Sequence, residues 1–192
     1  ILEAVAGAGL GLGLFGVLSI IRSDDGGATW HAGATYEVPD GATDADGNPA
    51  PDETALAIAG DGTLLVSARG AAPERLQLVA SPDGEQLQEV VPGKLIATTS
   101  GIDSTTVEGS VLGLGDDRVV LATLSDRDVR RGLRLYRKGD GLAWEAGPLV
   151  HAGPAAYSDL ARYGSTTIAV AAETGEREPY ERIEVIPFPV SK

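Results

Sequence analysis

Ser23-Asp24-Asp25-Gly26-Gly27-Ala28-Thr29-Trp30 is the stretch of the sequence that decides the fold. It follows the apolar, partly β-branched run 17–21, and an Asp-Gly-Gly turn between such a run and an aromatic residue predicts a β-hairpin. The two glycines can adopt positive φ, and the Ser23 and Asp25 side chains can hydrogen-bond to amides of the turn. We expect the indole of Trp30 to pack across this hairpin.

The composition narrows the classes of function. The chain has 192 residues, of which 43% are hydrophobic and 22% charged, so it can form one sizeable folded domain. A formal net charge of −13 argues against nucleic acid or an anionic membrane as the main partner. There is no cysteine and there are only two histidines, which excludes disulfides, thiolate metal sites and multi-histidine metal sites. We therefore predict no metal and no cofactor.

Short predicted strands recur along the chain, and turns rich in Gly, Asp and Pro separate them. They group into a first unit (55–59, 63–68, 75–80, 88–91), a second (110–113, 118–124, 133–137, 143–147) and a third (158–163, 167–172, 182–187). Degenerate copies of the 23–30 turn occur at Ser81-Pro82-Asp83 and at 138–141, which precedes Trp144. The uncharged run 4–21 is interrupted by glycines, so we interpret it as strand-forming rather than as a membrane span.

Repeating units of this kind are typical of β-propeller blades, which have roughly 40–45 residues each in comparable repeats. Together with the half unit around residues 17–30, they make about four blades. The sequence therefore predicts an all-β fold, a β-propeller of four-stranded antiparallel blades. Because an open stack of blades leaves strand edges unpaired, either a small ring closes within this chain or the chain is part of a larger ring.

The 23–30 turn resembles the Asp-box of sialidases and other β-propellers. Five further stretches resemble bacterial-type exo-α-sialidases (neuraminidases) in the order in which that family has them: 52–69, 109–112, 153–160, 171–173 and 180–183. The resemblance covers most of residues 17–187. It implies that residues 1–192 form a single sialidase-like β-propeller domain, the C-terminal portion of a six-bladed ring whose N-terminal blades are missing.

The resemblance implies a retaining glycosidase that releases terminal sialic acid from glycoconjugates through a tyrosine nucleophile. It assigns Tyr157 as the nucleophile and Glu53 as the base that takes its proton. Sialic acid carries a carboxylate on its anomeric carbon, which would repel a carboxylate nucleophile but not a neutral phenol. A phenol with a pKa near 10 needs such a base in order to react at neutral pH.

The resemblance also implies arginines that bind the substrate carboxylate, because a guanidinium can pair with it bidentately. Arg69 matches the second of the three arginines of the family. Arg130 and Arg131 both match the third, and Arg131 is preferred because Gly132 follows it as in the family. Glu173 would orient one of these arginines. The first arginine and the aspartate that acts as acid and base would lie in N-terminal blades that precede this sequence.

Simpler interpretations exist for each residue: a half-buried strand tyrosine, a loop carboxylate, a solvated basic pair and a glutamate at a strand end. The alternative function is a non-catalytic Asp-box propeller that binds glycans or proteins or serves as a scaffold. A third possibility is an exo-glycosidase for another acidic sugar. The expected partners are a sialylated glycan and a second chain or missing segment that completes the ring. Action on external glycans implies a secreted or cell-surface protein.

Overall fold

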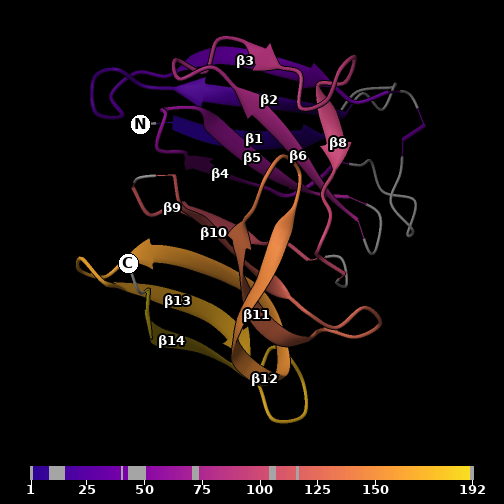
Figure 1. The fold of residues 1–192 in the computed structure, drawn as a ribbon, viewed down its shortest axis with the longest axis vertical. Helices are drawn as coiled ribbons and strands as arrows, with labels where there is room; N and C mark the ends of the chain where they lie inside the picture. Colours follow the sequence, from indigo (N-terminus) through magenta and orange to yellow (C-terminus); the bar gives the residue numbers. More distant parts are fainter. Residues whose placement is uncertain are drawn as a thin grey trace.

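The computed structural model describes residues 2–8, 16–39, 41–42, 51–70, 74–103, 107–115 and 117–190 (Figure 1). For residues 2–8 and 16 it describes the backbone but not the side chains. The described residues contain strands and no helix, which confirms the all-β prediction. The strands are β1 (Leu2–Ala8), β2 (Gly16–Arg22), β3 (His31–Glu37), β4 (Thr54–Ile58), β5 (Leu64–Arg69), β6 (Arg75–Ala80), β7 (Leu87–Gln88), β8 (Ile96–Thr98), β9 (Ser110–Gly113), β10 (Val119–Leu124), β11 (Arg131–Lys138), β12 (Trp144–Arg162), β13 (Thr167–Thr174) and β14 (Arg182–Pro189).

All ladders between these strands are antiparallel, and they form three sheets. The orders are β1-β2-β3, then β4-β5-β6-β7 with β8 also on β6, then β14-β13-β12-β11-β10-β9. The long strand β12 belongs to two ladders, because residues 144–154 pair with β11 and residues 155–162 pair with β13. The last sheet is thereby divided into two antiparallel units. In Figure 1 the units follow one another in chain order, from β1–β3 at the top to β13 and β14 at the bottom.

The predicted strands agree with this arrangement except near residue 90 and between 147 and 158, where the predicted strands 143–147 and 158–163 are parts of the single strand β12. The sequence predicts a strand over 88–91, but β7 ends at Gln88. Pro92 lacks a backbone N–H, and Gly93 adopts a φ of 75°, so the chain turns here instead of continuing along β6. The short strand β8 then pairs with the remainder of β6. Of the run 4–21, residues 4–8 lie in β1 and 16–21 in β2, while 9–15 lie outside the described residues.

Three clusters of buried side chains lie between the successive antiparallel units. One joins β2 and β3 to β5 and β6, the second joins β4 and β5 to β9–β12, and the third joins β10 and β11 to β12 and β13. Trp144, predicted as part of a degenerate Asp-box turn, is only 3% exposed and lies in the second cluster. The turn before it is closed by the backbone, through Gly139 N to Ala143 O at 3.0 Å and Ala143 N to Asp140 O at 2.9 Å.

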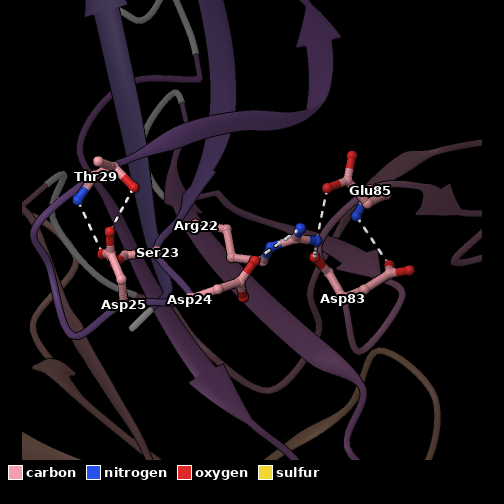
Figure 2. Close-up of polar contacts among 7 residues, drawn as sticks. All are labelled: Arg22, Ser23, Asp24, Asp25, Thr29, Asp83 and Glu85. Carbon is pink, nitrogen blue, oxygen red and sulfur yellow. Dashed lines mark hydrogen bonds and ion pairs between the residues drawn. The ribbon is translucent and has the colours of Figure 1, made fainter.

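The turn at 23–30 is held by its own side chains. The Ser23 hydroxyl accepts a hydrogen bond from Gly27 N at 2.7 Å and donates one to Asp25 Oδ1 at 2.9 Å. The Asp25 carboxylate also accepts from the backbone N–H of Thr29 at 2.9 Å and from its hydroxyl at 2.6 Å. The Trp30 indole N–H donates to Gly27 O at 3.2 Å, and the side chain stays 39% exposed at the surface. Figure 2 shows how Asp25 faces Thr29 across the turn.

The degenerate turn at Ser81–Asp83 repeats this pattern. Ser81 Oγ donates to Asp83 Oδ1 at 2.5 Å, and the Asp83 carboxylate accepts from Glu85 N at 3.1 Å. Arg22 connects the two turns, because its guanidinium contacts Asp24 Oδ2 at 3.1 Å and Glu85 Oε1 at 2.7 Å (Figure 2). Arg22 and the two turns therefore stabilise the contact between neighbouring units.

Asp25 is expected to make the stability of this turn depend on pH. Hydrogen bonds from the Thr29 side chain and backbone, and then from Ser23, hold the pKa of Asp25 well below its usual range. Since the folded-state pKa is the lower one, the stabilisation is full above the unfolded-state pKa of about 3.9 and is lost as pH falls from there through the folded-state pKa. We expect Asp25→Asn to lower the free energy of unfolding at pH 7 and to differ less from the unmodified protein in acid. Urea titrations at several pH values measure the free energy of unfolding, with a variant of an exposed aspartate, Asp117→Asn, as control. If the free energy of unfolding of Asp25→Asn depended on pH in the same way as that of Asp117→Asn, the prediction would be contradicted.

Candidate active site

The structure brings together Glu53 and Tyr157, which lie 104 residues apart in the chain. The Tyr157 hydroxyl donates a hydrogen bond of 2.7 Å to Glu53 Oε1. Glu53 directly precedes β4, and its carbonyl oxygen accepts from the backbone N–H of Arg69 at 2.9 Å, so the ladder with β5 continues past the strand and holds this residue. Tyr157 lies in the part of β12 that pairs with β13. A phenol and a carboxylate in direct contact form a pair suited to proton transfer.

Arg69 completes this contact from the end of β5. Its Nη1 lies 3.0 Å from Glu53 Oε2, so the phenol and the guanidinium occupy different oxygens of one carboxylate. The side chains of Arg69 and Glu53 are 12% and 27% exposed, which leaves both accessible to a ligand. Burial lowers the pKa of Arg69, but the hydrogen bond and charge of Glu53 outweigh burial and raise it. Arg69 is therefore a permanent cation at this site.

Arg130, not Arg131, is the second cation near Tyr157. The Arg130 guanidinium carbon lies 5.6 Å from the centroid of the Tyr157 ring. Arg131 is exposed, and its charge acts on Asp126. The two neighbours differ in direction because β11 begins at Arg131, where successive side chains point to opposite faces, and Gly132 adopts a φ of 74°. Which of the two arginines binds a substrate carboxylate stays a prediction.

Glu173, in β13, contacts the backbone beside Tyr157. Its Oε2 accepts a hydrogen bond of 3.3 Å from the backbone N–H of Tyr157. This contact lies next to a register shift between Ala155 and Ser158, where the ladder bonds of β12 and β13 are interrupted. Glu173 thus fixes the strand that carries Tyr157, and the orientation of an arginine by Glu173 stays a prediction.

The electrostatics of the pair keep the phenol protonated at neutral pH. Burial raises the pKa of Tyr157, and the hydrogen bond to Glu53 and the negative charge of Glu53 raise it further. Arg130 and Arg69 act in the opposite direction. The tyrosine can therefore act as a nucleophile only if a base removes its proton as it attacks, and Glu53 is the base in contact.

A cavity of about 720 Å³ lies beside this pair, lined by β4, β9 and β12. Two of its lining residues, Thr54 and Ser158, directly follow Glu53 and Tyr157 in the chain. Glu108 also faces this cavity, and burial, followed by the charges of Glu53 and Asp159, raises the pKa of Glu108. The sequence analysis did not identify Glu108, because a single glutamate before a short strand matches no motif.

Two further residues near the site, Arg75 and Tyr180, have no role that the sequence alone indicates. Arg75 is 2% exposed; its Nη1 donates to Val107 O at 2.8 Å and its Nε to Ser67 Oγ at 3.2 Å. Burial lowers the pKa of Arg75 to about 10, and its charge acts on Glu108. Tyr180, which follows β13, contacts Arg130. Neither position could be identified from spacing, since both depend on contacts between distant strands.

Within the described ranges, no three His, Asp or Glu side chains are grouped so that they could hold a metal ion. Nor does any helix in those ranges have the length and apolar character needed to cross a membrane.

No family model and no curated protein matches the chain. Solved structures do. A mutant of the NanB sialidase from Streptococcus pneumoniae is 18% identical, with a TM-score of 0.66 over 95% of this chain and 29% of that one. The intramolecular trans-sialidase of Ruminococcus gnavus, in complex with oseltamivir carboxylate, is 15% identical, with a TM-score of 0.64 over 92% of this chain and 40% of that one.

A Trypanosoma rangeli sialidase in complex with 2,3-difluorosialic acid, described as a covalent intermediate, is 13% identical. Its TM-score is 0.63 over 97% of this chain and 29% of that one. The chain thus spans between about a quarter and two fifths of the length of these sialidases. At such low identity the likeness concerns the fold, and the conclusion is that the chain has the fold of part of a sialidase.

Proposed function

We propose that the chain carries the nucleophile and base of a retaining exo-α-sialidase, which releases terminal sialic acid from glycoconjugates. The observation that carries this proposal is the 2.7 Å hydrogen bond from the Tyr157 hydroxyl to Glu53, with Arg69 on the other oxygen of the same carboxylate. A tyrosine with a purely structural role would need only one hydrogen-bond acceptor for its hydroxyl and no nearby cations. The pairing of a partly exposed phenol, its base and two cations at one place is what a sialoside requires.

The proposed reaction has two steps. In the first, Tyr157 Oη bonds to the anomeric carbon as its proton passes to Glu53, and the bond to the leaving-group oxygen breaks. That oxygen takes a proton from an acid that we place outside this chain. In the second step, water attacks the anomeric carbon while the same external group, now deprotonated, takes a proton from that water; the bond to Tyr157 Oη breaks, and the proton held by Glu53 returns to the phenolate. Two displacements at one carbon retain its configuration.

The two arginines of this site would bind the carboxylate of the substrate. Arg69 and Arg130 approach Tyr157 from β5 and from the start of β11, and both act electrostatically on its phenol. Because the whole chain carries a formal net charge of −13, a local pair of guanidinium groups is needed to attract an anionic sugar. We place Arg130 rather than Arg131 in this role.

The sheets are proposed to be blades of a propeller, with residues 1–192 as one domain of a six-bladed ring. The first strands of successive units contact one another, β1 with β4, β4 with β9 and β9 with β12, as the inner strands around a central axis would. Blades contributed by a further segment or a second chain would supply the first arginine of the family and the acid. By analogy with enzymes that act on external glycans, we propose a secreted or cell-surface location.

The proposal is tested by covalent trapping with 2,3-difluorosialic acid, the compound bound to the T. rangeli enzyme. Its 2-fluoride can leave without an acid catalyst, and its 3-fluorine slows hydrolysis of the intermediate by destabilising the oxocarbenium-like transition state. We expect intact mass to increase by one sugar and peptide mapping to place the adduct on Tyr157. Tyr163→Phe should react normally and Tyr157→Phe should not. A protein that stays unlabelled, or is labelled elsewhere, would instead support the non-catalytic propeller.

A further inference from the structure

Tyr180 contacts Arg130 from the segment between β13 and β14. Arg130 Nη1 donates a hydrogen bond to the Tyr180 hydroxyl, and the guanidinium carbon lies 5.8 Å from the centroid of the Tyr180 ring. The same carbon lies 5.6 Å from the centroid of the Tyr157 ring. Arg130 therefore lies between two tyrosines, only one of which the proposed reaction uses.

The segment that carries Tyr180 is compact. The Glu181 carboxylate accepts hydrogen bonds from the backbone N–H groups of Glu176 at 2.8 Å, Arg177 at 3.2 Å and Glu178 at 3.2 Å. Gly175 allows the close turn, because a Cβ at this position would lie 1.8 Å from Glu178 O. These contacts fix the backbone immediately before Tyr180, which limits the positions that its ring can take.

Both partners are also attached to the same point of β12. The carbonyl oxygen of Pro154 accepts from Gly175 N at 3.0 Å, at the start of the segment with Tyr180. The next residue, Ala155, donates its N–H to Arg130 O at 3.1 Å. Tyr157 follows two residues later. The strand that presents the proposed nucleophile thus sets the distance between Arg130 and Tyr180.

We infer that Tyr180 is a positioning residue that holds the Arg130 guanidinium beside Tyr157 before substrate binds. The role in substrate binding rests on the proposed function, whereas the contact between Tyr180 and Arg130 does not depend on it. Tyr180 is 56% exposed, so its ring adds little to the core, and its hydroxyl is the group that restrains Arg130. An arginine that is ordered in advance loses less side-chain entropy when it binds a carboxylate.

The order of the Arg130 side chain tests this inference directly. We expect the ¹⁵N order parameter of Arg130 Nε–Hε to fall from the rigid range, about 0.85, to below about 0.6 in both Tyr180→Phe and Tyr180→Ala. Tyr163→Phe, at a tyrosine that is 66% exposed in another turn, should leave it unchanged. If Arg130 stays equally ordered in both Tyr180 variants, the inference is overturned, whatever the catalytic activity.

A binding measurement connects the same variants to the substrate. N-acetylneuraminic acid and its methyl ester differ in the charge that Arg130 would recognise. We expect Tyr180→Phe to weaken binding of the acid about three- to tenfold and to leave the ester unaffected. Equal affinities of the unmodified protein for acid and ester would overturn the proposed carboxylate site while leaving the positioning of Arg130 intact. Reduced order without weaker binding of the acid would overturn the role of that positioning in recognition.

Discussion

Tyr157→Phe is expected to abolish turnover of a fluorogenic sialoside by the full-length protein. Removal of the hydroxyl leaves the ring in place but takes away the atom that would bond to the anomeric carbon. Glu53→Gln should reduce kcat by about 10²–10⁴, because the amide keeps the size of the side chain but cannot accept the proton. The reduction of kcat in Tyr157→Phe should be at least as large as in Glu53→Gln, since the base acts only through the nucleophile.

The two variants also distinguish catalysis from binding. Both should bind N-acetylneuraminic acid with nearly unchanged affinity, because Arg69 and Arg130 remain. Tyr163→Phe is the matched control for a tyrosine remote from Glu53. A Tyr157→Phe protein that keeps its full kcat would refute the nucleophile assignment even if the fold and the carboxylate site were correct.

Gly101→Ala is expected to destabilise the protein by about 2–5 kcal/mol, the sum of a left-handed backbone penalty and a steric overlap. Gly101 has a φ of 83°, and a Cβ there would lie 1.9 Å from the carbonyl oxygen of Trp144. The backbone can hardly move away, because Trp144 N donates to Ser100 O at 2.9 Å and Ile102 lies with Trp144 in one buried cluster. Chemical denaturation measures the loss.

Gly93→Ala is the control for Gly101→Ala. Gly93 has a similar φ of 75°, but no atom lies within 4 Å of its would-be Cβ. Its cost should therefore be the backbone penalty alone, about 1–2 kcal/mol. Equal losses for the two variants would mean that the close approach of Gly101 to Trp144 does not limit the packing in the buried cluster that contains Ile102 and Trp144.

The candidate site could be predicted only in part. The sequence analysis named Glu53, Arg69 and Tyr157, and the structure brings their side chains into contact. Their roles stay predictions until the variants are measured. The sequence favours Arg131 over Arg130 because Gly132 follows it, whereas the structure has Arg130 beside the Tyr157 ring, a neighbour that local spacing does not indicate. Which of the two binds the substrate carboxylate stays a prediction.

The sequence by itself determined the strands and the turn at 23–30. The hydrogen bonds described for that turn join residues two to four positions apart, so its residue types largely specify its shape. The tertiary structure decided the rest. Trp144 is buried, Arg130 lies between two tyrosines, and Tyr157 meets Glu53 only because several sheets pack together. Such contacts depend on the direction of each side chain in the packed fold, which local spacing does not contain.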